Sequence, residues 1–198
     1  MTRTGSNQPH DERRALILAA AERLLRHYGP QKTTIAEIAR EAEVGVGTVY
    51  LEFPSKEAIV EELSAGRHQA VLDAMRHALA GGGTFVERFR RLFDARLAAF
   101  QTIEREGAHA RDLVHCVNPA VKTAHGRYKA AEHELLAGLL TEAVVAGEFD
   151  CPDVADCAAA LLQAYAAFGP PMVFGQCAGL TERLEALHRV VLYGLVRR

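Results

Sequence analysis

The chain contains no tryptophan, only three methionines and four cysteines among 198 residues, and a net charge of just −2. It also lacks any run of about 18 apolar residues, so we expect no membrane-spanning helix and no membrane partner. The N-terminus has no apolar signal core, which favours a cytoplasmic location. The cysteines lack zinc-ligand spacing, and a cytoplasmic location argues against disulfides among Cys116, Cys151, Cys157 and Cys177.

Motifs for catalysis and for cofactors are missing too. The sequence has no nucleophile elbow, no phosphate-binding loop and no His-Glu-x-x-His zinc motif. Nine histidines raise the alternative of a metal or haem sensor, but neither His125 with His133 nor His109 with His115 has the spacing of a closed zinc site. We therefore predict a protein that is not an enzyme and that has no cofactor and no metal site.

Residues 31–62 carry the most informative pattern in the chain. Thr34 and Glu37 form a capping box, which satisfies the free amides at a helix start. An apolar stripe at helical spacing follows and is interrupted at Gly45, a residue that can adopt backbone angles closed to β-branched residues. A second short helix runs from about 46 to 53. Two short helices joined by a tight turn predict a helix–turn–helix, which presents one helix to the major groove of DNA.

The rest of the chain predicts further helices and no strands. Apolar residues from Ile17 to Tyr28 recur at helical spacing, and Gly29-Pro30 ends that helix. Downstream, caps and breaks predict a short segment at 108–116 and helices at about 55–80, 84–106, 118–146, 153–168 and 181–197. We therefore expect an all-α protein with a disordered tail at 1–10, a three-helix bundle at 11–62 and a larger helical domain at 63–198.

The sequences Thr-Thr-Ile-Ala-Glu-Ile-Ala at 33–39 and Gly-Thr-Val-Tyr-Leu-Glu-Phe-Pro-Ser-Lys-Glu-Ala-Ile-Val at 47–60 resemble the DNA-binding domain of the TetR family of transcriptional regulators. The resemblance spans about residues 12–62. It implies an all-helical homodimer that binds a palindromic operator, usually as a repressor. It also implies that a small-molecule effector bound in the domain of residues 63–198, which would also form the dimer, releases the protein from DNA.

The resemblance further implies a set of DNA contacts. Thr33, Thr34 and Lys56 lie near helix starts, where amides, hydroxyls and a positive charge can bind phosphate. Thr48 and Tyr50 offer hydroxyls to bases or to the DNA backbone, and we expect them to be the firmest contacts. The full expected set is Thr33, Thr34, Gly45, Val46, Gly47, Thr48, Tyr50, Leu51 and Lys56.

Three positions depart from the family, which commonly has Ser at Gly45, Lys at Val46 and His at Glu52. Val46 could contact a thymine methyl group, and Glu52 could either accept from cytosine or repel phosphate. Specificity would then depend on DNA shape and phosphate positioning. Residues 1–60 hold eight Lys/Arg and eight Asp/Glu, so no basic surplus supports tight non-specific binding. A helical ligand- or partner-binding module that has lost DNA recognition is therefore the alternative.

The last two predicted helices have apolar faces wider than one neighbouring helix covers, which favours an intersubunit helix bundle over ordinary core. The residues expected at this homodimer interface are Leu161, Tyr165, Leu184, Leu187, Val191 and Leu195.

Aromatic and polar residues between 84 and 175 would suit a pocket for a hydrophobic or aromatic effector, although an aromatic stripe at helical spacing also fits plain core. The expected pocket residues are Phe89, Phe93, Arg96, Phe100, His115, His125, Tyr128, Gln163 and Phe168.

Overall fold

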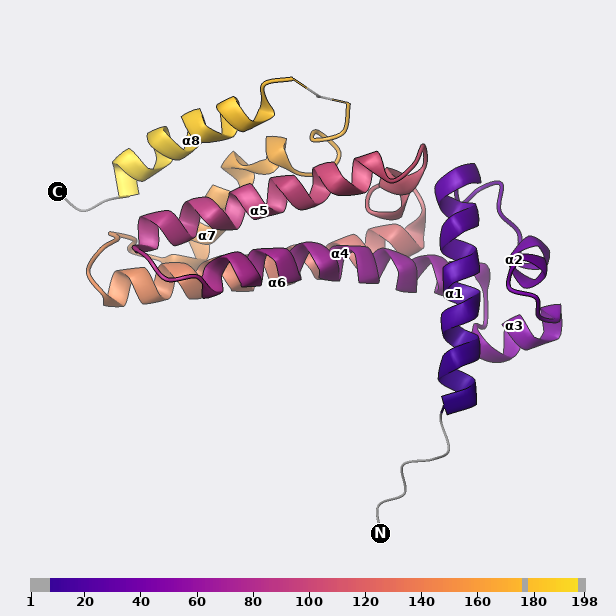
Figure 1. Cartoon of the computed structure of the whole chain (residues 1–198). Coiled ribbons are helices and arrows are strands. Elements are labelled where there is room, and N and C mark those ends of the chain that lie inside the picture. Colours follow the sequence, from indigo (N-terminus) through magenta and orange to yellow (C-terminus); the bar gives the residue numbers. More distant parts are fainter. Residues whose placement is uncertain (1–7, 176–177, 196–198) are drawn as a thin grey trace, which may run out of the picture. The chain divides into compact units, whose positions relative to one another are not determined.

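The computed structural model describes residues 8–175 and 178–195, without the side chains of residues 8, 9, 194 and 195. Over this part the chain forms α-helices and short 3-10 helices, which confirms the all-α prediction (Figure 1). The α-helices are α1 Gln8–Tyr28, α2 Ile35–Glu41, α3 Val46–Glu52, α4 Lys56–Ala80, α5 Phe85–Arg105, α6 Pro119–Val145, α7 Val154–Ala164 and α8 Leu180–Leu195. The 3-10 helices are η1 Ala110–Leu113 and η2 Ala166–Phe168. None of the helices described is long and apolar enough to cross a lipid bilayer.

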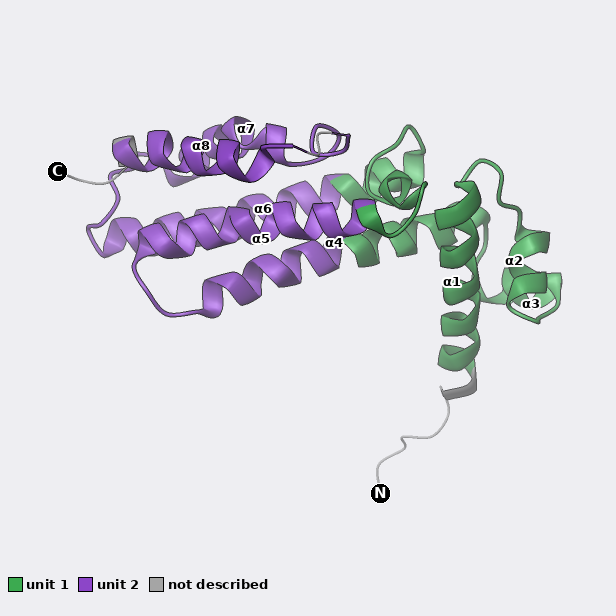
Figure 2. Ribbon diagram, turned by 45° about the horizontal axis from the view of Figure 1, so that its top comes forward, with its two compact units in different colours: residues 1–67, 105–125 green, residues 68–104, 126–198 purple. Residues whose placement is uncertain are grey.

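Two compact units divide the chain (Figure 2). Unit 1 comprises residues 1–67 and 105–125, and unit 2 comprises residues 68–104 and 126–198. Because α1 already begins at Gln8, residues 8–10 are helical and do not belong to the expected disordered tail. The rest of that tail lies outside the described residues.

The core of unit 1 is built from one face of α1 and the inner faces of the next three helices. Ile17 and Leu25 of α1 are fully buried with Ile38 of α2, Val49 of α3 and Ile59 of α4. Fully burying an aliphatic side chain of this size stabilises the fold by about 1.5–3 kcal/mol. Residues after α5 also join this core, namely Leu113, Ala120 and Val121. They enlarge a core that α1 to α3 alone would leave small.

The predicted capping box at the start of α2 is confirmed. The Glu37 amide donates to Thr34 Oγ1 at 3.3 Å, and the Thr34 amide donates to a Glu37 carboxylate oxygen at 2.8 Å. Hydrogen bonds from the Thr34 hydroxyl and amide lower the pKa of Glu37. The same arrangement recurs at α5, where Thr84 and Glu87 exchange such bonds.

The turn between α2 and α3 uses a different residue from the one expected. Gly45 is extended, with φ −71° and ψ 148°, and serves as the N-cap of α3, whereas Glu43 takes the left-handed conformation with φ 56°. The Val44 amide donates to the Ala39 carbonyl and the Glu43 amide to the Arg40 carbonyl, at 2.9 and 3.2 Å. These two bonds form a Schellman motif, which requires a left-handed residue directly after the C-cap.

Unit 2 packs α5 among the parts of α4 and α6 that belong to it, with α7 and α8 alongside (Figures 1 and 2). Phe89, Phe93 and Phe100 of α5 are buried. The Phe93 ring stacks on Tyr165 with centroids 3.8 Å apart, and the Phe89 ring lies edge-on to Tyr165 at 5.9 Å. Aromatic stacking therefore joins α5 to the end of α7.

Cys151 and Cys157 form a disulfide at the start of α7, so the expectation of no disulfide is wrong. The pairing follows from the cap: Asp153 accepts hydrogen bonds from the amides of Ala155 and Asp156, which turns the chain back beside Cys151. Cys116 is a free thiol. Cys177 lies outside the described residues.

Replacing Glu43 with glycine should stabilise unit 1, because glycine adopts the left-handed conformation without the steric cost of a Cβ. We expect the free energy of unfolding to rise by about 0.5–1 kcal/mol. Ala36→Gly, at an exposed position inside α2, is the matched control and should lower it by about 1 kcal/mol. Urea unfolding followed by circular dichroism measures both changes, and a loss of stability in Glu43→Gly would contradict the turn geometry.

Candidate DNA-binding site

The outward face of α3 is open to solvent while its inner side is buried. Val49 is fully buried, whereas Val46, Tyr50 and Leu51 are 43%, 53% and 84% exposed. Val46 and Tyr50 lie one helical turn apart, as do Gly47 and Leu51, so these residues share one face. Thr48 is half-buried beside them, and Gly45 and Gly47 are exposed. We call Val46, Gly47, Tyr50 and Leu51 the outward face of α3.

Two of the expected phosphate contacts have partners inside the protein. The Thr33 side chain is buried, and its hydroxyl donates to the Gly29 carbonyl at 2.9 Å. This hydroxyl therefore does not serve as a phosphate ligand. The Lys56 ammonium donates to the carbonyls of Pro30 and Thr33 at 2.9 and 3.1 Å. These bonds tie the start of α4 to the loop before α2 and leave one ammonium proton for another acceptor.

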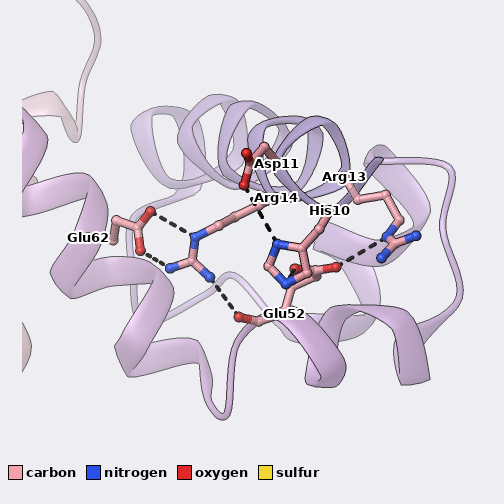
Figure 3. Close-up of polar contacts among 6 residues, drawn as sticks. All are labelled: His10, Asp11, Arg13, Arg14, Glu52 and Glu62. Carbon is pink, nitrogen blue, oxygen red and sulfur yellow. Dashed lines mark hydrogen bonds and ion pairs between the residues drawn. The ribbon is translucent and has the colours of Figure 1, made fainter. Parts of the chain in front are cut away.

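Glu52 has neither of the roles considered for it, because its side chain is only 1% exposed (Figure 3). Arg13 Nε donates to Glu52 Oε1 at 3.1 Å, and His10 Nε2 lies 2.9 Å from Oε2. Arg14 donates to the Glu52 main-chain carbonyl at 2.8 Å and pairs with Glu62. The first turns of α1 therefore hold the C-terminal end of α3 by charge-assisted hydrogen bonds.

These partners are hard to predict from the sequence, because Arg13 lies 39 residues before Glu52. One signal was available. Glu52 lies three positions after the core residue Val49 and so falls on the inner face of α3, where a carboxylate needs a cationic partner. The Arg14 guanidinium also lies 4.1 Å from the centre of the Phe53 ring, which adds a cation–π contact to the same anchor.

Because the Glu52 carboxylate is buried, the outward face of α3 presents no charged side chain. Exposed cations lie nearby on other segments, at Lys32 in the loop before α2 and at Arg40 within α2. Arg23 is instead paired with Glu41 at 2.9 Å. Electrostatic attraction to phosphate would thus come from α2 and the loop before it, and not from α3 itself.

Four of the expected pocket residues fill the interior of unit 2, where Phe89, Phe93, Phe100 and Phe168 are buried against other rings. The other five are Arg96, Tyr128, His115, His125 and Gln163. Gln163 is exposed, and the His115 and His125 rings contact each other within unit 1. The structure therefore does not bring the full set together.

Arg96 and Tyr128 belong to a buried polar network in unit 2. Arg96 Nε lies 2.5 Å from Glu132 Oε1, and a second Arg96 nitrogen donates to the Tyr165 carbonyl at 3.1 Å. The Tyr128 hydroxyl donates to Glu132 at 2.6 Å. Burial raises the pKa of Tyr128, which keeps this hydroxyl a neutral donor. The network compensates a charge pair that would otherwise be costly to bury.

A pocket of about 230 Å³ lies within unit 1. Its lining is Tyr28, Gly29, Pro30, Gln31, Lys32, His109, Asp112, Cys116, Val117 and Asn118. None of these is among the expected pocket residues.

The expected dimer residues divide into two groups. Leu161, Tyr165 and Leu184 are buried within the protomer, because α7 and α8 turn these side chains toward the aromatic core of unit 2. Leu187 and Val191 are half-buried, and the side chain of Leu195 lies outside the described residues. The large apolar residues exposed on α8 are Val190 and Tyr193, at 73% and 77%. Helical spacing identified the apolar residues of α7 and α8 but did not show which of them face outward.

Glu52→Ala should destabilise unit 1, because it removes the acceptor for Arg13 and the ring nitrogen contact of His10. We expect a loss of about 1–2 kcal/mol, less than for a fully buried pair because both cations are half-exposed. Glu12→Ala, at an exposed position of α1, should change stability by less than about 0.5 kcal/mol. Equal thermal unfolding curves for the two variants would show that Glu52 does not stabilise the packing of α3 against α1.

Residues 17–63 match the model of the family described as bacterial regulatory proteins, tetR family. No curated protein matches the chain. Among solved structures, a TetR/AcrR-family transcriptional regulator from Thermobifida fusca YX-ER1 has a TM-score of 0.70 and 23% identity, covering 94% of this chain and 100% of that one.

Two further solved structures are similar across the chain. The regulator FadR from Bacillus subtilis, in complex with stearoyl-CoA, has a TM-score of 0.69 and 19% identity, covering 91% of this chain and 98% of that one. The TetR regulator TylP from Streptomyces fradiae has a TM-score of 0.63 and 23% identity, covering 95% and 88%. At these identities the likeness establishes the fold, and the family model identifies the helix–turn–helix. Residues 17–63 thus match the helix–turn–helix domain of the tetR family of bacterial regulatory proteins, and the whole chain has the fold of the TetR-family regulators named above.

Proposed function

We propose that the protein is a ligand-responsive transcriptional regulator, a repressor that binds a palindromic operator as a homodimer and is released by a small hydrophobic or aromatic effector. The observation that carries the proposal is the two-sided environment of α3. Its inner side is buried and its C-terminal end is held by α1, while Val46, Tyr50 and Leu51 remain open to a partner. A rigid helix with a free outward face suits insertion into the major groove.

The proposed DNA contacts fall into two classes. The hydroxyls of Thr48 and Tyr50 would bond to base edges or to phosphate, and Gly45 and Gly47 let the backbone of α3 approach the duplex closely. The amides at the start of α2, with Thr34, and the remaining proton of Lys56 would bind phosphate. We add Lys32 and Arg40 as phosphate contacts, because both are exposed on the segment that leads into and forms α2.

Homodimerisation would use the outer faces of α7 and α8. Val190 and Tyr193 are the large exposed apolar residues among the described side chains of α8, and Leu187 and Val191 of the same helix are half-buried. A twofold dimer suits a palindromic operator, whose two half-sites lie about one DNA turn apart.

Control by an effector would act through α4, a single helix whose residues 56–67 belong to unit 1 and 68–80 to unit 2. An effector that binds the DNA-free conformation more tightly would weaken operator binding, and DNA would weaken effector binding by the same factor. The stearoyl-CoA named with the Bacillus subtilis FadR structure supports a hydrophobic effector class.

The second candidate is a helical ligand- or partner-binding module without DNA recognition. The absence of a charged side chain on the outward face of α3 favours it, because most DNA-reading helices carry cations. Binding to fragments selected from the source genome separates the two. Saturable binding that weakens with salt supports the regulator, whereas no binding at low salt supports the module.

Tyr50→Ala should weaken binding to a selected fragment about tenfold, which corresponds to ~1.4 kcal/mol. Tyr28→Ala is the matched control, since Tyr28 is 51% exposed and Tyr50 is 53% exposed. Fluorescence anisotropy titrations at fixed salt would measure both dissociation constants. Unchanged affinity in Tyr50→Ala would show that α3 is not the recognition helix.

Replacing both Val190 and Tyr193 with glutamate should yield monomers, because each new charge would be buried in the proposed interface. Val145→Glu, at an 84% exposed position that ends α6, should leave the dimer intact. Sedimentation equilibrium measures the assembly. A double variant that remains dimeric would exclude this face of α8.

A further inference from the structure

The outward face of α3 is apolar. Val46, Tyr50 and Leu51 are the exposed large side chains of this helix, and Leu51 is 84% exposed. The only charged residue of α3 is Glu52, whose carboxylate is buried against Arg13 and His10. No arginine, lysine, asparagine or glutamine lies on α3 to pair with a base edge.

The chemistry of the major groove limits what such a face can read. Guanine and adenine present acceptors and donors that specific recognition meets with Arg, Lys, Asn or Gln. Cytosine presents an amino donor, which a carboxylate would accept, but Glu52 is engaged elsewhere. The apolar group in the groove is the C5 methyl of thymine, which packs against aliphatic side chains.

We propose that Val46 and Leu51 determine the sequence preference of this protein by packing against thymine methyl groups, so that each operator half-site carries thymines opposite them. The inference rests on the proposed DNA-binding function and deepens it by naming the bases that α3 reads. Thr48 and Tyr50 would fix the position of the helix, and the two aliphatic side chains would discriminate between bases.

The local geometry gives these side chains access to the bases. A Cβ built on Gly47 would meet nothing within 4 Å, so the groove side of the helix has open space one turn before Leu51. Gly45 and Gly47 carry no side chain that would hold α3 away from the base pairs. Val46 lies in the first turn of α3 and Leu51 in the last, so two separate bases can be read.

The test starts from duplexes selected by the purified full-length chain from a random pool. Each thymine of the selected half-site is then replaced by uracil, which keeps the base pair and removes only the methyl group. We expect one or two replacements per half-site to weaken binding about fourfold each, the ratio that ~0.8 kcal/mol per buried methyl group gives.

The variant Leu51→Ala identifies the residue responsible. In this variant uracil replacement opposite position 51 should no longer weaken binding, while replacement opposite Val46 should still do so. Leu16→Ala is the control, because Leu16 is 56% exposed on α1 and should retain the full uracil effect at both sites. This comparison distinguishes a contact from a general loss of affinity.

The outcomes separate the inference from the proposed function. Equal affinity for thymine and uracil duplexes at every position would overturn the inference and leave the regulator intact. Failure of the chain to select any duplex at low salt would overturn both. Self-association of the chain that Leu51→Glu abolishes, without DNA binding, would show that the face binds a second copy and would also overturn both.

Discussion

The attachment of α3 to α1 is the constraint on which the DNA-binding site depends. A helix of seven residues has too few internal hydrogen bonds to hold its own position, so its orientation comes from packing. Val49 and Phe53 supply the apolar part by entering the core of unit 1. Arg13 and Arg14 supply the polar part by holding the side chain and the carbonyl of Glu52. Both parts act on the inner side of α3 and leave its outer side free.

This arrangement also explains an apparent conflict in the charges of the domain. Residues 1–60 hold as many acidic as basic side chains, which is unusual for a DNA-binding domain. The structure shows that several of these charges neutralise each other inside unit 1, as in the Arg23–Glu41 pair. Lys32, in the loop before α2, and Arg40, within α2, remain exposed. Weak attraction to phosphate combined with apolar contacts to bases would favour specific over non-specific DNA sites, because contacts to bases depend on the DNA sequence.

Much of the fold could be predicted because its signals are local. The capping boxes at Thr34 and Thr84 and the cap at Asp153 involve residues within one turn, and each helix they begin is present. The partners of Glu52 could not be predicted in this way, since they come from α1 and depend on tertiary packing. The turn at Glu43 was missed for a related reason: glycine is permitted in a left-handed conformation but does not require it.

The candidate site was predictable to a similar degree. The exposure of Val46, Tyr50 and Leu51 follows from helical spacing once Val49 is assigned to the core. Spacing alone could not show that Thr33 faces inward, or that Leu161 and Leu184 are covered by their own protomer. Which apolar face of a helix is covered depends on neighbours that lie far away in sequence. The aromatic residues of α5 illustrate this, because the same periodicity fits a pocket and a filled core.

Photo-cross-linking from the DNA tests the central claim most directly and leaves the protein unchanged. Iodouracil in place of thymine keeps a group of about the size of the methyl at the same ring position and cross-links to a side chain in contact with it. We predict that cross-links from a selected half-site map to the peptide of residues 46–51, which carries Val46 and Leu51. Cross-links confined to peptides outside α2 and α3 would show that the outward face of α3 does not lie in the groove.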